Sequence, residues 1–202
     1  MKTKNKIKVK ATELFNSKGF KNVTLREVAK ELGISYGNVT YHYKTKKDVI
    51  ESLYEDMLLE TKQIMQTFDM TNLFKGILEA PKLTFLISMK YLFFYVDFVE
   101  VKRSYIELAK LIEKDNEERK FGYLLLLHQL QKEGILREEL TQSDLDYLMN
   151  LSGAMRTFFF INLPSNNFKD NDLETKYVNY VNQLVYPYLT QKGIEKYKEY
   201  LS

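Results

Sequence analysis

Residues 24–43 read TLREVAKELGISYGNVTYHY. In the first part of this stretch, apolar residues recur every three or four positions, which is the spacing of one buried helix face. Thr24 is placed to cap this helix, and Gly33 is placed to end it in a left-handed conformation. Ser35 is a good N-cap for a second helix, so the turn between the two helices is very short. The stretch therefore predicts a helix-turn-helix, a motif whose second helix enters the major groove of DNA.

A further helix is predicted over about residues 4–18. The apolar side chains from Ile7 to Phe15 fall on one helical stripe, as they do in a helix that packs on a core. In the helix that follows the turn, Val39 and Tyr43 are one helical turn apart and are expected to face the same core. These three short helices are therefore predicted to form one compact head.

Charge is distributed unevenly along the chain. The first 47 residues hold 12 Lys or Arg and three Glu, whereas the rest of the chain holds 18 Lys or Arg and 24 Asp or Glu. The overall net charge of +3 conceals this contrast. A basic block of this kind is the electrostatic footprint of a nucleic-acid-binding module. A merely soluble lysine-rich tail accounts for the lysines up to Lys10, but not for the basic residues that follow within the block.

The predicted helix over residues 35–43 leaves several hydrogen-bonding side chains on its outer faces. Tyr36, Asn38 and Tyr41 stand where a solvent-facing helix usually carries Glu, Lys or Ala. Side chains of this kind reach phosphate oxygens and base edges. Gly37 costs roughly 1 kcal/mol of helix propensity relative to Ala, and its missing side chain would let the backbone approach DNA.

Residues 24–29 and 33–49 resemble the corresponding stretches of the TetR family of transcriptional regulators, and residues further upstream continue the match. In that family, the positions of Tyr41, His42 and Lys46 contact phosphates. The resemblance implies a repressor that binds a palindromic DNA operator as a homodimer and responds to a small molecule. We expect a cytoplasmic protein that is not an enzyme.

The resemblance further implies contacts to bases or backbone at Arg26, Tyr36, Gly37 and Asn38. The full set that we expect to contact DNA comprises Thr24, Arg26, Ser35, Tyr36, Gly37, Asn38, Thr40, Tyr41, His42 and Lys46. Thr40 departs from the family's pattern, which commonly has tyrosine there, and Tyr43 stands where phenylalanine is usual. Three alternatives remain open: His42 as an ordinary surface or core histidine, Asn38 as a solvent-facing residue and Lys46 as a solvated charge.

The composition predicts an all-α fold. Only three prolines and eight glycines occur in 202 residues, which disfavours a turn-rich β-protein. We expect an N-terminal helix-turn-helix DNA-binding domain over residues 1–47 and a helical ligand-binding and dimerisation domain over residues 48–202. Thr45 and Asp48 form a capping pair that predicts the start of the first helix of the second domain.

Further helices are expected along the second domain. Their predicted ranges are 72–79, 82–101, 104–113, 117–133, 141–162, 172–186 and 188–201. Gly134, the stretch 164–171 and Pro187 are expected to separate the later ones. The apolar run from Leu83 to Val101 contains charged residues, so it is predicted to be a buried helix rather than a membrane span.

Aromatic residues are crowded in this second part of the chain, more densely than one small core needs. A ligand cavity or a subunit interface would accommodate the surplus. By the resemblance, the helices from Thr141 to Asn162 and from Asp172 to Tyr186 pair with their copies in the homodimer. The polar residues expected to orient a hydrophobic or aromatic effector are Tyr91, Tyr95, His128 and Arg156. For His128 and Arg156, a purely structural role is the alternative.

Several function classes are excluded or disfavoured. The chain contains no cysteine, so disulfides, thiolate nucleophiles and Cys-ligated zinc sites are ruled out. It has two histidines, and it carries none of the glycine-rich phosphate loops, metalloprotease motifs or nucleophile elbows of common enzymes. We therefore expect no metal and no cofactor. The remaining alternatives to a DNA-binding regulator are a helical small-molecule enzyme and a scaffold at a membrane surface.

Overall fold

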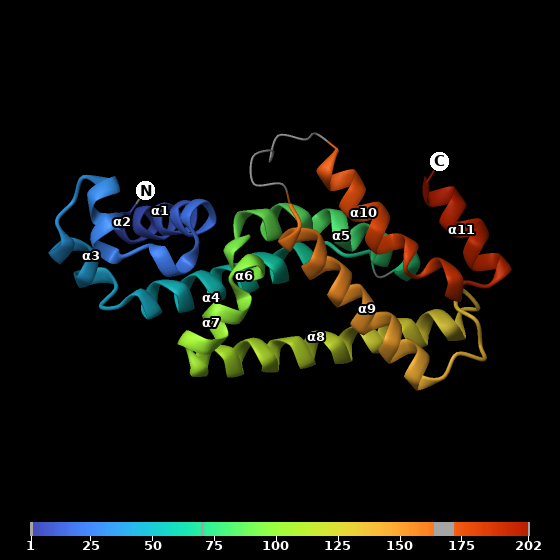
Figure 1. Cartoon of the computed structure of the whole chain (residues 1–202). Coiled ribbons are helices and arrows are strands. Elements are labelled where there is room, and N and C mark those ends of the chain that lie inside the picture. The colour runs from blue at the N-terminus through green and yellow to red at the C-terminus, as the bar shows by residue number, and fades with distance from the viewer. Residues whose placement is uncertain (1, 70, 164–171, 202) are drawn as a thin grey trace. The chain divides into compact units, whose positions relative to one another are not determined.

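The computed structural model describes residues 2–69, 71–163 and 172–201. In these parts the chain is helical, with one isolated bridge between Leu136 and Leu189, and the predicted all-α fold is confirmed (Figure 1). The α-helices are α1 (Thr3–Lys18), α2 (Leu25–Leu32), α3 (Tyr36–His42), α4 (Lys46–Met65), α5 (Leu73–Lys90), α6 (Phe93–Val96), α7 (Phe98–Ser104), α8 (Ile106–Lys132), α9 (Gln142–Ile161), α10 (Leu173–Gln183) and α11 (Gln191–Leu201). Two 3-10 helices, η1 (Phe20–Asn22) and η2 (Tyr186–Tyr188), complete them.

The chain divides into two compact units. The N-terminal unit comprises Met1–Gln63 and Ile87–Ile112, and the C-terminal unit comprises Ile64–Leu86 and Glu113–Ser202. The N-terminal unit therefore contains the three-helix head, most of α4 and the segment that forms α6 and α7. The predicted boundary after residue 47 separates a DNA-binding domain from a ligand-binding domain by function, and it stays a prediction.

The head folds for the local reasons that its sequence suggests. The Thr24 hydroxyl accepts a hydrogen bond from the Glu27 backbone N–H at 3.2 Å, and Gly33 ends α2 with φ of 64°. The Ser35 hydroxyl accepts a hydrogen bond from the Asn38 backbone N–H at 3.1 Å and starts α3. These interactions satisfy backbone groups at the helix ends and fix the short turn. The predicted helix-turn-helix is confirmed.

Glu27 lies three residues after the N-cap Thr24, where the spacing would let it bond back to the N-cap backbone. In the structure its carboxylate instead accepts a hydrogen bond from the Lys18 ammonium at 2.6 Å. This ion pair lowers the pKa of Glu27, and the hydrogen bond from Lys18 is the main cause. The ion pair thus joins the end of α1 to the first turn of α2.

The core of the C-terminal unit is built from α5, α8, α9 and the C-terminal helices. Its fully or nearly fully buried members include Leu78, Leu127, Leu130, Leu136 and Leu145. A capping box starts α9, since the Thr141 hydroxyl accepts from the Asp144 backbone N–H while the Asp144 carboxylate accepts from the Thr141 backbone N–H. These features hold α9 in a defined position within its own unit.

Several predicted helix limits were wrong. The break expected between residues 79 and 82 is absent, because α5 continues through Pro81. Proline costs about 3 kcal/mol in a helix interior. Buried residues on both sides of it, among them Leu78 and Phe85, keep the helix continuous by packing. The predicted ranges 104–113 and 117–133 are one helix, α8, because the charged stretch between them is exposed helix rather than loop.

The predicted helix 82–101 is also divided, between the end of α5, α6 and α7. The range 172–186 is shorter as observed, since α10 ends at Gln183. The stretch 164–171, predicted to be a break, lies outside the described residues.

Candidate nucleic-acid interface

Helix α3 exposes a polar face because two of its side chains anchor the other face. Val39 is 0% exposed and Tyr43, the C-cap residue, is 3% exposed, as the sequence predicts. The Tyr43 hydroxyl lies 3.3 Å from the Ser52 hydroxyl on α4, which fixes the end of α3 against the following helix. The remaining side chains of α3 therefore point away from the core of the head.

Arg26 and Tyr36 lie together on this outer face. The Arg26 guanidinium, which comes from α2, lies over the Tyr36 ring with 4.6 Å between its carbon and the ring centroid. Both side chains are exposed. A cation over an aromatic face is attracted by the ring quadrupole. This stacking orients the guanidinium while leaving its N–H groups free to reach phosphate or base acceptors.

The packing and backbone conformation of the protein do not require a glycine at position 37. A methyl group built on it would have only the Ser35 hydroxyl within 4 Å, at 3.9 Å, and its φ is not positive. The fold therefore tolerates a larger residue at this position. A glycine that the protein does not need for its own packing is consistent with close approach by an outside molecule.

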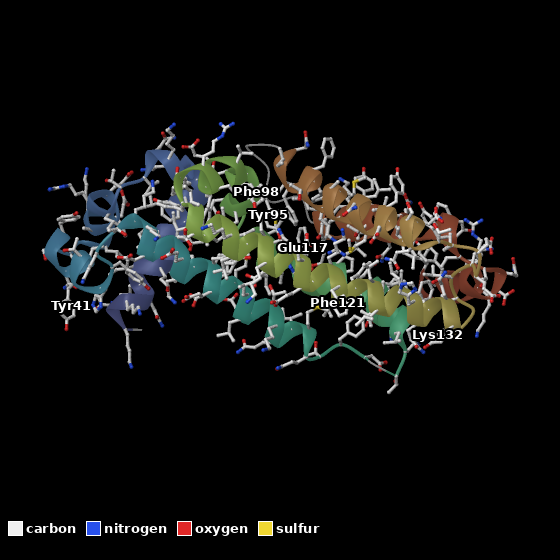
Figure 2. The ribbon with its side chains drawn as sticks, turned by 90° about the horizontal axis from the view of Figure 1, so that it is seen from below. Tyr41, Tyr95, Phe98, Glu117, Phe121 and Lys132 are labelled. Carbon is white, nitrogen blue, oxygen red and sulfur yellow. The ribbon has the colours of Figure 1, made fainter. Side chains whose placement is uncertain are left out.

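Tyr41 is the most exposed large side chain on α3, at 84% of its area, and Figure 2 shows it projecting outward from the head. The half-buried His42 ring packs edge-on against the Tyr41 ring, with 5.1 Å between centroids. An aromatic residue exposed to this degree gains little from burial, so its hydroxyl is available for phosphate contact.

Thr40 is placed on the same helix but uses its hydroxyl internally. The Thr40 hydroxyl donates toward the carbonyl oxygens of Tyr36 and Gly37, each at 3.2 Å. Its proton is therefore engaged in the helix, and only its oxygen lone pairs face outward. Thr24, Ser35 and Asn38 are exposed, and the hydroxyls of the first two cap their helices.

Lys46 is directed into the head rather than away from it. Its ammonium donates to the carbonyl oxygens of Phe20 and Lys21 in η1 and lies 4.1 Å from the centroid of the Phe20 ring. Burial lowers the pKa of Lys46, while the nearby Asp97 acts in the opposite direction. Lys46 thus has partners of its own in the head, and a phosphate contact would be made in addition to them or by rearrangement.

Two residues that the sequence did not single out hold the head to the segment of α6 and α7. The Asn16 side chain accepts from the Phe93 backbone N–H at 2.9 Å and donates to the Lys90 carbonyl at 2.8 Å. The Asp97 carboxylate accepts from the Phe20 backbone N–H at 2.6 Å. Each interaction joins residues more than 70 positions apart, so local sequence patterns carry no signal for it.

The four predicted ligand residues are divided between the two units. Tyr91 is 1% exposed and donates from its hydroxyl to the Glu60 carboxylate at 2.9 Å, while the Tyr95 hydroxyl lies 3.0 Å from that of Ser88. Burial is the main cause that raises the pKa of Tyr91 well above its ordinary range, and Glu60 adds to it. Tyr91 is thus buried and hydrogen-bonded inside the N-terminal unit.

The other two predicted ligand residues lie in the C-terminal unit. His128 places its ring nitrogens 3.1 Å from the Gln131 amide oxygen and 2.8 Å from that of Gln142, and it borders a hollow of about 540 Å³. Arg156 on α9 contacts the hydroxyls of Ser152 and Tyr177. His128 and Arg156 therefore occupy separate environments with different partners.

Within the described ranges, no group of three or more His, Asp or Glu side chains is arranged to hold a metal ion. Over the same ranges, none of the helices combines the length and the apolar character that crossing a membrane requires.

Comparisons of the sequence with known families match both parts of the chain. The profile described as bacterial regulatory proteins, tetR family, matches residues 7–53, and the profile described as bacterial transcriptional repressor matches residues 51–197. The HTH-type transcriptional regulator YttP of Bacillus subtilis (strain 168) is 32% identical over 65 residues. This match covers 32% of the chain and 31% of YttP, so the chain spans about a third of that relative's length.

Solved structures share the fold over nearly the whole chain. A TetR-family transcriptional regulator from Marinobacter aquaeolei VT8 has a TM-score of 0.82 at 21% identity and covers 99% of each chain. A transcriptional regulator from Saccharomonospora viridis, solved in complex with choline, has a TM-score of 0.76 at 17% identity, with 93% of this chain and 98% of that chain covered.

Proposed function

This chain belongs to the TetR family of bacterial transcriptional regulators, and from that premise we propose that it is a ligand-responsive repressor that binds a palindromic operator as a homodimer. Members of the family bind DNA and regulate transcription, and they are not enzymes. In this proposal, residues 1–47 form the DNA-binding domain and residues 48–202 form the ligand-binding and dimerisation domain. A protein that occupies chromosomal operators would act in the bacterial cytoplasm.

The observation that carries the proposal is the outer face of α3. Asn38 and Tyr41 are exposed there, Arg26 is stacked on Tyr36 beside them, and Gly37 leaves the backbone open. We assign base contacts to Asn38 and Arg26, because amides and guanidinium groups match the hydrogen-bonding edges of bases in the major groove. Phosphate contacts are assigned to Tyr41, His42 and Lys46, and supporting contacts to Thr24, Ser35, Tyr36, Gly37 and Thr40.

An exposed apolar stripe on α9 supports the proposed dimer. Tyr147, Phe158 and Ile161 are 60%, 62% and 51% exposed, at spacings that place them along one side of the helix. Tyr180 on α10 is also 51% exposed. Large apolar side chains that share one helix face are typical of an interface with another subunit. We therefore propose that α9 and α10 pair with their copies around a two-fold axis.

The proposed mechanism is occlusion of a promoter. In a two-fold dimer, the two α3 helices occupy successive major grooves about 34–36 Å apart. Binding of a hydrophobic or aromatic effector in the second domain would favour a spacing of these helices that the operator does not match. The effector then lowers affinity for DNA because it binds one of two states more tightly than the other.

The experiment that tests this function is selection of bound fragments from the source genome, followed by binding measurements on the selected sequence. We expect a palindromic site, two chains per duplex, and lower transcription of a reporter that carries the site in its promoter. A selected site that binds a single chain would contradict the dimer, and a reporter that rises on binding would contradict repression. A failure to enrich any sequence at low ionic strength would contradict DNA recognition itself.

A further inference from the structure

The core-facing side of α9 carries an arginine. Leu145, Leu148 and Ser152 are buried at spacings of three and four residues along this side, and Arg156 is the next position on the same stripe. Arg156 is half-buried, and the buried Phe160 follows one turn later. A guanidinium therefore occupies a place on the helix that otherwise holds core residues.

The hydrogen-bond partners of Arg156 among the described residues are neutral. Its Nε donates to the Ser152 hydroxyl and its Nη1 donates to the Tyr177 hydroxyl, both at the long distance of 3.4 Å. Tyr123 on α8 also lies within electrostatic reach, since burial raises its pKa and the charge of Arg156 acts to lower it. Among the described residues, no carboxylate pairs with Arg156. Within the described ranges, two hydroxyls thus contact the guanidinium and no carboxylate does.

The surroundings of this group are aromatic. The Tyr177 ring lies 5.0 Å from the Phe160 ring, 5.1 Å from the Phe159 ring and 5.4 Å from the Phe85 ring, measured between centroids. Rings from α5, α9 and α10 therefore meet beside the guanidinium. Arg156 and Phe159 are both half-buried, so the cluster is accessible from solvent.

An anion would give the guanidinium stronger interactions than these neutral hydroxyls do. A charge moved out of water loses hydration, and neutral hydroxyls compensate only in part. An anion bound to the guanidinium would form charge-assisted hydrogen bonds, which are stronger and shorter than the 3.4 Å contacts to hydroxyls. A single positive charge suits a monoanionic carboxylate better than a doubly charged phosphate, and the hydroxyls would donate to the carboxylate oxygens.

We propose that Arg156, together with the hydroxyls of Ser152 and Tyr177, binds the carboxylate of an effector whose apolar body packs against the neighbouring phenylalanine rings. The proposal rests on the function above, because it names the chemical class of the small molecule to which the regulator responds. Arg156 would bind the charged group of the effector, and the aromatic cluster would pack against its apolar body.

The test uses the full chain and four probes, each with one linear chain of ten carbons: decanoate, decyl phosphate, decanol and decyltrimethylammonium. In decanoate the tenth carbon is that of the carboxylate, and all four probes are used below the concentrations at which they form micelles. Binding is measured by calorimetry and by the rise in melting temperature. We expect decanoate to bind and to raise the melting temperature, with decanol and decyltrimethylammonium giving no comparable shift. Preference for decyl phosphate over decanoate would overturn the assignment of a carboxylate.

Variants separate this role from a structural one. Arg156→Gln should weaken decanoate binding roughly 10- to 100-fold, the loss expected for charge-assisted hydrogen bonds. Its unliganded melting temperature should equal or exceed that of the unaltered protein, because a half-buried charge that no described carboxylate pairs with is removed. Arg119→Gln, at an exposed arginine on α8, is the matched control and should leave decanoate binding unchanged. Tyr177→Phe should weaken binding by a smaller factor and gives a second reading if Arg156→Gln folds poorly.

Three outcomes would overturn the proposal. The first is equal binding of decanoate to Arg156→Gln and to the unaltered protein. The second is a loss of binding in His128→Gln with none in Arg156→Gln, which would place the ligand in the hollow beside His128. The third is the absence of decanoate binding to the unaltered protein. Because these measurements use no DNA, their failure is distinct from a failure to bind an operator.

Discussion

Helices α3 and α11 each contain a glycine in their first turn, and the two glycines have different surroundings. A methyl group on Gly193 in α11 would collide with the carbonyl oxygen of Ile135 and would lie 3.1 Å from the Leu189 Cβ. A methyl group on Gly37 in α3 would meet open space apart from the Ser35 hydroxyl at 3.9 Å. Packing inside the protein thus explains Gly193, whereas the reason for Gly37 lies outside the protein.

The same contrast extends to the regions around these glycines. Near Gly193, the Thr190 hydroxyl donates to the carbonyl of Gly134 at 2.6 Å, so a short hydrogen bond fixes the residue that precedes α11. On α3, Tyr41 remains 84% exposed. A residue type that the fold does not need for its own packing therefore indicates a binding surface.

Gly193→Ala should have the largest effect. Because the added methyl group overlaps a backbone carbonyl, the fold must shift, and we expect a loss of about 1–3 kcal/mol of unfolding free energy. Thermal unfolding measures it as a fall in melting temperature of several degrees. Gly122→Ala on α8, where nothing lies within 4 Å of the added methyl group, is the control and should not destabilise the protein. Equal stability of both variants would contradict the comparison.

Asn38→Ala should mainly alter sequence preference. A bidentate contact between an amide and adenine contributes about 1–3 kcal/mol of discrimination, so affinity for the operator should fall while affinity for base-substituted operators changes less. Fluorescence anisotropy with a set of singly substituted duplexes measures this. Asn116→Ala, at an exposed asparagine on α8, should leave the whole set unchanged. A uniform loss across all duplexes would instead assign Asn38 to the phosphate backbone.

Lys46→Ala should weaken binding to all sequences alike and reduce the salt dependence of affinity by about one unit, as expected for one phosphate contact. The variant also loses the hydrogen bonds from Lys46 to the carbonyls of η1, so some stability is lost as well. Lys192→Ala is the matched control, because the Lys192 ammonium also donates to a backbone carbonyl, that of Glu133, at 2.7 Å. An unchanged salt dependence for Lys46→Ala would show that this lysine contacts no phosphate and only stabilises the head.

Gly37→Ala should change stability and function in opposite directions. Since the position accepts a methyl group, we expect a gain of about 0.4–1 kcal/mol in unfolding free energy, together with weaker operator binding. Thermal unfolding and anisotropy on the same preparation measure the two. Gly122→Ala should share the gain and keep the affinity. If the Gly37→Ala protein binds the operator as tightly as the unaltered protein does, the claim that DNA approaches this glycine closely is wrong.

The smallest effect concerns the cap of α9. Hydrogen bonds from the Thr141 hydroxyl and backbone N–H lower the pKa of the Asp144 carboxyl below its ordinary value. A lowered pKa means that the ionised form stabilises the fold, and this stability is lost as pH falls through the folded-state pKa. NMR titration of the Asp144 carboxyl should show this low value, and Thr141→Ala should raise it toward the ordinary one. An equal value in both proteins would mean that the capping box does not persist in solution.

The head could be predicted closely because its signals are local. Thr24, Gly33 and Ser35 act within four residues of themselves, and the apolar stripes of α1 to α3 are read directly from spacing. The rest of the chain could be predicted only in outline. Helix α5 continues through Pro81 because residues distant in sequence pack on both sides of it, and no local rule indicates this.

The candidate site shows the same limit. Exposure of Asn38 and Tyr41 follows from the helical pattern that buries Val39 and Tyr43. The inward direction of Lys46 and the role of Asp97 depend on η1, which the sequence did not predict. The neutral hydroxyls that contact Arg156 lie on α9 and α10, and the sequence pattern alone did not bring them together.

The most direct test of the account is a hydroxyl-radical footprint on the selected operator at low ionic strength. Two α3 helices presented by a symmetric dimer should protect two equivalent windows whose centres are about 10–10.5 base pairs apart, or a whole multiple of that spacing. A single protected window, or none at protein concentrations that saturate the duplex, would contradict the claim that α3 reads DNA as one half of a pair.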